Sequence, residues 1–184
     1  MFIETKETPN PSSIMFYPGI EVMNSQEPLY FTKTDVCKES AFARILLEIN
    51  GVDCVFLGKD FITVTKNDDY DWYALKPHIL GHIMEAIINK VPFYSVNEPK
   101  VEVERSDIDN SIIAQIKEVI EEKVRPAVAQ DGGDIVFHSF EEGIVYLKML
   151  GACSGCPSSS ITLKSGIENM LRYYVPEVVE VRQI

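Results

Sequence analysis

Hydrophobic and polar residues alternate with two different periods in the first half of the chain. A period of two runs through VDCVFLGKDFITVTK (52–66) and predicts two strands joined by the turn Gly58-Lys59-Asp60. Shorter strands are expected at FIETKE, SIMFYP and PLYFTK. Spacings of three and four predict two helices. Their apolar residues are Phe42, Ile45, Leu46 and Ile49 in the first and Leu75, Ile79, Ile83, Ala86 and Ile87 in the second.

Cap and breaker residues set the expected ends of these two helices. Asn50-Gly51 is expected to end the first, because such a pair accepts the left-handed conformation that closes a helix. The second is expected from about Trp72 to Asn89. In that helix Pro77 is expected in a position that a first turn could tolerate.

The second half of the chain predicts the order helix, strand, strand, loop, helix, strand. Its first helix has Asp109 as N-cap and is expected to kink or stop at Pro126. IVFHSF and IVYLKML alternate on either side of a turn at 141–143 and predict a hairpin. A last helix is stopped by Pro176 and followed by a closing strand. The whole chain is therefore expected to be α+β, and its second half to contain a three-stranded sheet with two helices.

Composition divides the chain into two small domains. We expect an α+β domain at 1–95, a linker at 96–106 and a second domain at 107–184, because 94–110 is polar and carries alternating charges. Residues 1–95 hold 8 basic and 13 acidic residues, and 107–184 hold 7 and 12, so each carries a net charge of −5. Neither half is therefore a charged tail on the other.

The charge and hydropathy of the chain argue against two classes of partner. A net charge of −11 repels phosphate backbones, so we expect no nucleic-acid partner. No segment approaches 18 uninterrupted apolar residues, so we expect no membrane span. The segment MFIETKETPNPSS lacks a secretory signal pattern. We therefore expect a cytoplasmic protein, with a matured mitochondrial protein as the alternative.

The strongest candidate chemistry is the motif GACSGCPSSS (151–160), which places Cys153 and Cys156 two residues apart. The motif follows a predicted strand, and Pro157 suits the first position of the next helix. Backbone N–H groups at a helix start lower the pKa of a thiol and stabilise anionic ligands. The neighbouring glycine, alanine and serine residues leave no bulk over the sulfurs, so we expect an open site.

Three kinds of site remain compatible with this motif. A dithiol oxidoreductase or redox sensor uses the same order of strand, CxxC and helix. A zinc site and an iron–sulfur cluster both require four ligands in the common case. Cys37 and Cys54 lie in the other half, and Cys54 is expected in its core, facing inward with Val52 and Phe56. Two chains related by a two-fold axis would supply four thiolates from this one loop.

Other residues of metal-binding type have simpler interpretations. Asp131 and Asp134 lie in DGGD, which is interpreted as a tight turn. His138 lies within a predicted strand and is expected to be an ordinary sheet residue. His78 and His82 are four residues apart on a predicted helix, without an evident third ligand. The first half therefore shows no chemistry of its own, and we expect it to recognise clients or assembly partners.

The second half resembles the C-terminal domain of the NifU/Nfu family of iron–sulfur scaffold proteins. The matching pieces, in order, are RPAVAQDGGD, the hairpin, GACSGCPSS, ITLKSGIE and PEVVEV. The first half resembles the Nfu N-terminal domain, through ETKETPNPSSIMFYPG, SAFARILLEINGVDCVFLGKDFITVTK and WYALKPHILGHIMEAI. Together the two resemblances cover nearly the whole chain.

The resemblance implies a specific role for the motif. Cys153 and Cys156 would ligate an iron–sulfur cluster shared between two protomers, commonly 4Fe–4S and alternatively 2Fe–2S. The cluster would come from upstream assembly proteins and pass to apo client proteins. Such a carrier binds and transfers without a general acid or base, so we do not expect an enzyme.

Overall fold

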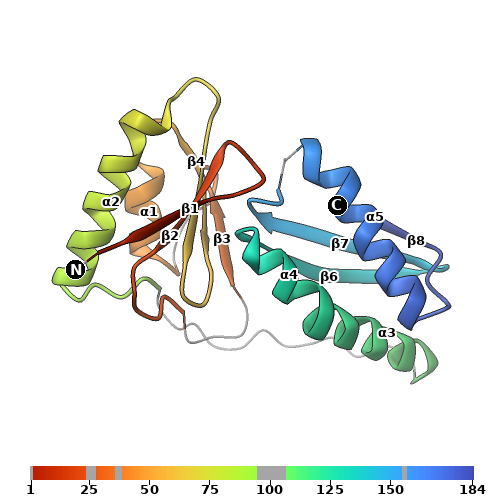
Figure 1. The fold of residues 1–184 in the computed structure, drawn as a ribbon. Coiled ribbons are helices and arrows are strands. Elements are labelled where there is room, and N and C mark those ends of the chain that lie inside the picture. Colours follow the sequence, from red (N-terminus) through yellow and green to blue (C-terminus); the bar gives the residue numbers. More distant parts are fainter. Residues whose placement is uncertain (1, 24–27, 36–38, 95–106, 155–156) are drawn as a thin grey trace. The chain divides into compact units, whose positions relative to one another are not determined.

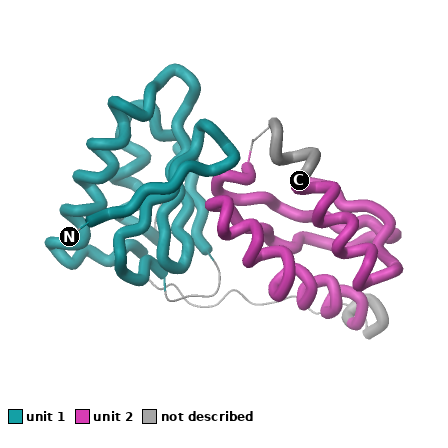
Figure 2. The backbone as a smooth tube through the Cα atoms, in the orientation of Figure 1, with its two compact units in different colours: residues 1–98 teal, residues 99–184 magenta. Residues whose placement is uncertain are grey.

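The computed structural model describes residues 2–23, 28–35, 39–94, 107–154 and 157–184, with mixed helices and strands throughout (Figure 1). The chain separates into two compact units, Met1–Glu98 and Pro99–Ile184 (Figure 2). The α+β class expected from the sequence is confirmed. The expected linker, 96–106, lies outside the described residues, so its boundaries stay a prediction.

Unit 1 is built on a five-stranded antiparallel sheet. Its strands lie in the order β1 (Glu4–Glu7), β2 (Ser13–Tyr17), β5 (Ile62–Lys66), β4 (Val52–Leu57) and β3 (Leu29–Thr32). All five correspond to strands expected from the sequence. Strands β1 and β3 are the two edges of the sheet.

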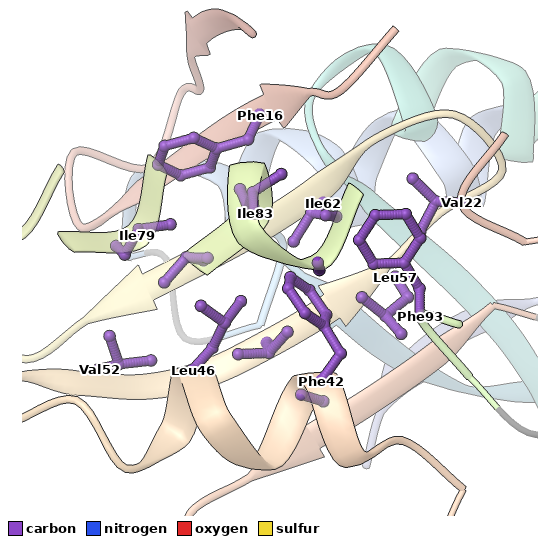
Figure 3. Packing of buried hydrophobic residues seen from close by; sticks show 14 of the residues in the cluster. Phe16, Val22, Phe42, Leu46, Val52, Leu57, Ile62, Ile79, Ile83 and Phe93 are labelled. Carbon is purple, nitrogen blue, oxygen red and sulfur yellow. The ribbon is translucent and has the colours of Figure 1, made fainter. Parts of the chain in front are cut away.

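Helices α1 (Ala41–Leu47) and α2 (Trp72–Ile88) bury their apolar sides in one cluster with the sheet. Figure 3 shows side chains from both helices and from the strands converging in this cluster. Residues two apart along β5, Ile62 and Val64, both belong to it, as the alternating pattern requires. The side chain of Ser40 caps α1 by accepting a hydrogen bond from the backbone N–H of Ala43 (2.8 Å).

Three local expectations for unit 1 are wrong. Helix α1 ends at Leu47, before Asn50-Gly51, and Gly51 instead uses a φ of +98° in the turn into β4. Pro77 lies beyond the first turn of α2, because that helix begins at Trp72. The carbonyl of Tyr73 therefore lacks the usual N–H partner four residues on, because proline has no amide hydrogen.

Cys54 is the third. It is only half-buried, although Val52 and Phe56 are both buried. The register of β4 against β5 shifts between Val52 and Cys54, so the simple alternation used to place the thiol does not hold. Val52 belongs to the helix-covered cluster, whereas Cys54 does not.

Unit 2 has a three-stranded sheet in the order β6 (Gly133–Glu141), β7 (Ile144–Gly151) and β8 (Glu180–Gln183). Strands β6 and β7 form the expected antiparallel hairpin. Helix α5 (Pro157–Tyr174) lies between β7 and β8 in the chain, and these two strands pair in parallel. A second core cluster, with members from 116 to 181, lies entirely within this unit.

The helix that opens unit 2 does not stop at Pro126. Helix α3 (Asp107–Val119) continues through a π-helical turn, η1 (Ile120–Val124), into α4 (Arg125–Gln130). The wider turn accommodates a proline ring that would clash with the carbonyl four residues back in a regular helix. The expected N-cap, Asp109, already lies inside α3.

In the part of the chain that the structure describes, no helix has the length and apolar character needed to cross a bilayer.

Candidate functional site

The loop that follows β7 positions Cys153 against a glycine turn. Strand β7 ends at Gly151, whose φ of +65° turns the chain sharply. The backbone N–H of Ala152 donates to the carbonyl of Gly132 (3.1 Å), and that of Ser154 donates to the carbonyl of Gly151 (3.0 Å). The first of these hydrogen bonds ties the start of the cysteine loop to the residue before β6, and the second closes a turn within the loop.

The side chain of Cys153 is buried, which differs from the open site expected from its small neighbours. It is 4% exposed and belongs to the hydrophobic core of unit 2. A Cβ added to Gly133 would lie 2.6 Å from the Sγ of Cys153 and 2.7 Å from the carbonyl oxygen of Leu150. The space that a side chain at Gly133 would need is therefore filled by the thiol and by backbone.

Cys156 lies outside the described residues, so the structure does not place the second thiol. The helix start beside it is where the sequence predicted it, because α5 begins at Pro157. The unpaired N–H groups of a helix start favour negative charge by about 0.3–1 kcal/mol per charge. The backbone thus brings a thiol and a helix N-terminus into one short loop.

A largely buried ion pair joins α4 to the start of β6, next to the glycine turn. Arg125 on α4 donates from Nε and Nη2 to the two carboxylate oxygens of Asp134 on β6 (2.8 and 2.6 Å). The Asp134 side chain is 6% exposed, so this bidentate pair lies largely out of water. Hydrogen bonding to Asp134 raises the pKa of the Arg125 guanidinium above its ordinary value, although partial burial opposes the shift. Glu121 accepts a further hydrogen bond from Nη1 of Arg125 (2.5 Å).

This pair accounts for one of the two carboxylates considered as metal ligands. Asp134 is engaged by Arg125, whereas Asp131 is the exposed C-cap of α4. Among the residues that the structure describes, no group of three or more His, Cys, Asp or Glu side chains is placed to hold a metal ion. The interpretation of DGGD as a turn agrees with this arrangement.

The remaining candidates are dispersed. His138 is exposed on β6, where the register against β7 shifts. His78 is exposed, and His82 lies 3.8 Å from a carboxylate oxygen of Glu85. Cys54 accepts a hydrogen bond from the Tyr30 hydroxyl (3.2 Å) in unit 1. Cys37 lies outside the described residues.

The sequence interpretation missed the steric role of Gly133. A tight turn explains glycines by positive φ, but only Gly132, at +80°, has such a φ among the two glycines of DGGD. Gly133 is instead the first residue of β6 and pairs with Gly151 on β7. The signal that could have revealed it is the second glycine itself, because one positive φ requires only one glycine.

Comparison with known proteins finds a matching family model for each of the two units. Residues 116–182 match the family model described as NifU-like domain, and residues 3–90 match the model described as scaffold protein Nfu/NifU N terminal. The chain is 42% identical over 184 residues to "NFU1 iron-sulfur cluster scaffold homolog, mitochondrial" of Drosophila persimilis, covering 100% of this chain and 65% of the relative. The same description and identity apply to a Drosophila ananassae relative, of which 64% is covered. The chain thus spans slightly less than two thirds of the length of these curated relatives.

Among solved structures, a NifU-like protein from Saccharomyces cerevisiae, determined in solution by NMR, is similar with a TM-score of 0.48 and 23% identity. The match covers 53% of this chain and 87% of the yeast one.

Proposed function

Because the chain belongs to the Nfu/NifU-like family of iron–sulfur cluster scaffold proteins, we propose that it carries an iron–sulfur cluster on Cys153 and Cys156 and passes it to apo client proteins. The observation that carries the proposal is the position of Cys153 between the end of β7 and the N-terminus of α5, in the unit that matches the NifU-like domain. Thiolates are the ordinary ligands of such clusters.

Counting ligands supports a cluster shared between two chains. A cluster takes four thiolates in the common case, and the described residues of one chain offer no group of three or more ligand side chains. Two copies, each contributing Cys153 and Cys156, supply four. We therefore propose a cluster-bridged homodimer that holds 4Fe–4S, with 2Fe–2S as the alternative.

Burial of Cys153 adds a step to this proposal. A thiol that is 4% exposed must turn outward before its Sγ can meet a cluster on a two-fold axis. The short side chains of Ala152 and Ser154 limit the steric cost of that movement, because they carry no large group across the loop. The hydrogen bond from Ala152 that ties the loop to Gly132 would break or lengthen in the same step.

Transfer would proceed by thiolate exchange. A client cysteine loses its thiol proton, its sulfur forms a bond to iron, and the bond between that iron and Cys153 or Cys156 breaks. The released thiolate takes up a proton, so no electron is gained or lost. Such exchange requires access and ligand competition without a general acid or base, so we propose a carrier and not an enzyme.

The partners and location follow from the same role. We propose upstream assembly proteins as donors and apo iron–sulfur proteins as acceptors, with unit 1 recognising some of them. A cytoplasmic location stays a prediction. The names of the Drosophila relatives include the word mitochondrial, which makes the mitochondrion the competing location. Fractionation of the source cells distinguishes the two.

Anaerobic reconstitution with ferrous iron and sulfide tests the proposal. We expect about four irons and four sulfides per dimer in the wild type and a dimeric native mass. Cys153→Ser and Cys156→Ser should lose both the metal and the charge-transfer absorption. Cys54→Ser is the matched control, because this thiol is half-buried in the other unit, and it should load like the wild type.

Two results would overturn the shared-cluster proposal. A colourless monomer that forms a reversible Cys153–Cys156 disulfide and reduces disulfide substrates would indicate an oxidoreductase. A colourless dimer that contains zinc after metal analysis would indicate a zinc-bridged assembly.

A further inference from the structure

Unit 1 contains a hollow of about 460 Å³ between the β1–β2 turn and the start of α2. One wall is the segment from Glu7 to Pro11 with Ser13 and Ile14, and the other consists of Trp72, Tyr73 and Lys76. We call this the Trp72 hollow. None of its lining residues belongs to the cysteine loop or to unit 2.

The walls of the Trp72 hollow are tied together before any ligand arrives. The indole Nε1 of Trp72 donates to the carbonyl of Pro11 (3.0 Å), and the Ser12 hydroxyl donates to Asp68 (3.1 Å). Within the turn, the backbone N–H of Ser12 donates to Oδ1 of Asn10 (3.0 Å). A preformed hollow loses little conformational entropy when a ligand binds.

Aromatic surface is available at this site. Tyr73 is 91% exposed although it lies in the first turn of α2, where an ordinary surface position favours a polar residue. Trp72 is half-buried and packs partly against the core. Aromatic ring faces attract Lys and Arg side chains, with Trp the strongest.

The hollow adjoins an edge strand of the sheet. Strand β1, red in Figure 1, is the last strand on its side of the sheet, and Glu7 belongs both to β1 and to the hollow. No strand from the described part of the chain pairs with its outer edge. An extended segment from another protein can therefore add to β1 by backbone hydrogen bonds and place a side chain in the hollow.

Charge around the site favours a basic segment. Glu7 and Lys76 line the hollow with opposite charges. The loop before α2 adds Asp68, Asp69 and Asp71, and β1 carries Glu4 at its start and Lys6 next to Glu7. Together these are five carboxylates and two ammonium groups.

We propose that the Trp72 hollow and the outer edge of β1 dock an extended segment of a protein partner that carries arginine or lysine. The segment would add as a sixth strand beside β1 and place a cationic side chain against the rings of Trp72 and Tyr73. This goes beyond cluster binding, because it names a recognition surface on the unit that does not hold the CxxC motif. It also does not depend on whether Cys153 binds iron.

Trp72 is the one tryptophan in the sequence, so its emission reports on this hollow without a label. Peptides that bind the full-length chain would be selected from a random library displayed on phage. The selected peptides would then be synthesised and titrated into the protein while Trp72 emission is followed. In the selected peptides we expect many Arg and Lys residues, alternating with β-branched residues. The peptides should change the emission saturably, and their affinity should fall as salt is raised.

Two variants locate the binding, each with a matched control in the other unit. Tyr73→Ala and Glu7→Lys remove the exposed ring and reverse the wall charge, and each should weaken binding about tenfold or more. Tyr173→Ala and Glu177→Lys make the same changes at exposed positions of unit 2 and should leave binding unchanged. Circular dichroism checks that all four fold. Iron uptake by Tyr73→Ala should equal that of the wild type, so failure of this proposal is distinguishable from failure of the cluster proposal.

Three outcomes would overturn the docking proposal. The first is a selection that yields no peptide, or only acidic or uncharged ones. The second is binding that leaves Trp72 emission unchanged or survives both unit 1 variants. The third is emission that changes with protein concentration alone, which would assign the hollow to a second copy of the chain.

Discussion

At the scale of single residues, the environment of Cys153 depends on an atom that is missing from Gly133. The Sγ of Cys153 lies 2.6 Å from where a Cβ would be, closer than real Cβ atoms approach other atoms. The second obstacle, the Leu150 carbonyl, belongs to the backbone of β7 and cannot rotate away. Any side chain at Gly133 must therefore displace the thiol, the hairpin or both.

We predict that Gly133→Ala destabilises unit 2 by about 1–3 kcal/mol, the usual range for overpacking. It should also make Cys153 react faster with iodoacetamide, because the thiol is pushed outward. Urea unfolding followed by circular dichroism and peptide mapping of the alkylated protein measure the two effects.

The control is Gly166→Ala in α5, where a Cβ would meet no atom within 4 Å. It should stabilise the unit by about 0.5–1 kcal/mol, because alanine is the better helix former. Equal stability and equal Cys153 reactivity in the two variants would contradict the steric role of Gly133.

The second thiol that the structure places, Cys54, shows how two neighbours act in opposite directions. Burial raises the pKa of the Cys54 thiol above its ordinary value, and the hydrogen bond from Tyr30 lowers it in part. The Tyr30 hydroxyl donates to sulfur, so it favours the thiolate over the thiol.

We predict that Tyr30→Phe raises the pKa of Cys54 further, because the thiolate loses its donor. At about pH 8.5 the variant should therefore alkylate at Cys54 roughly twofold or more slowly than the wild type. Mass spectrometry of the Cys54 peptide across a pH series measures the rate. An unchanged or faster rate would show that the hydroxyl does not stabilise the thiolate, and Tyr173→Phe controls for the loss of a tyrosine elsewhere.

At the scale of elements, helix ends link segments that are distant in the sequence. The Ser40 hydroxyl accepts from the N–H of Ala43 and donates to the carbonyl of Phe93 (2.5 Å). One fully buried side chain therefore caps α1 and fastens the chain after α2. The rings of Phe42 and Phe93 meet edge to face beside it, with centroids 4.8 Å apart.

We predict that Ser40→Ala lowers the free energy of unfolding of unit 1 by about 1–3 kcal/mol, because it removes a cap and leaves the Phe93 carbonyl without this donor. Asp71→Ala removes the exposed cap of α2, whose carboxylate accepts from the N–H of Tyr73, and should lower it by about 0.5–1 kcal/mol. Urea unfolding followed by Trp72 emission compares the two. A smaller loss for Ser40→Ala than for Asp71→Ala would contradict the double role of Ser40.

At the scale of the whole molecule, the two units have separate cores. One cluster draws its members from residues 3 to 94 and the other from residues 112 to 181. The two expected domains, 1–95 and 107–184, also carry equal net charge, −5 each. Each unit therefore has the hydrophobic core needed to fold by itself.

We predict that residues 99–184 alone take up as much iron per chain as the full protein, whereas residues 1–98 alone take up none. The truncated protein should transfer its cluster more slowly to at least one client, because it lacks the proposed recognition surface on β1 and α2. Iron analysis and single-turnover transfer to apo clients measure both. Equal transfer rates for all clients would count against a recognition role for unit 1.

Local sequence patterns predicted most of the elements correctly, because they act over a few residues. The sequence predicted every strand that the structure describes in both sheets, by alternation in the two hairpins, and Pro157 marked the start of α5. The errors lie where a distant contact or an altered backbone intervenes. At Pro126, where a kink or a stop is expected, the helix does not stop, because a π-helical turn accommodates the proline. The shifted register at Cys54 breaks the period-of-two alternation used to place that thiol.

The sequence by itself determined the α+β class, the order of the elements and the location of the CxxC motif between a strand and a helix. Periodicity, turn chemistry and helix caps are properties of neighbouring residues, so they can be interpreted without a fold. Only the tertiary structure decided that Cys153 is buried, that Gly133 must lack a side chain and that Trp72 and Pro11 enclose a hollow. Each of these depends on segments 17 or more residues apart meeting in space, and no local pattern specifies which side chains meet.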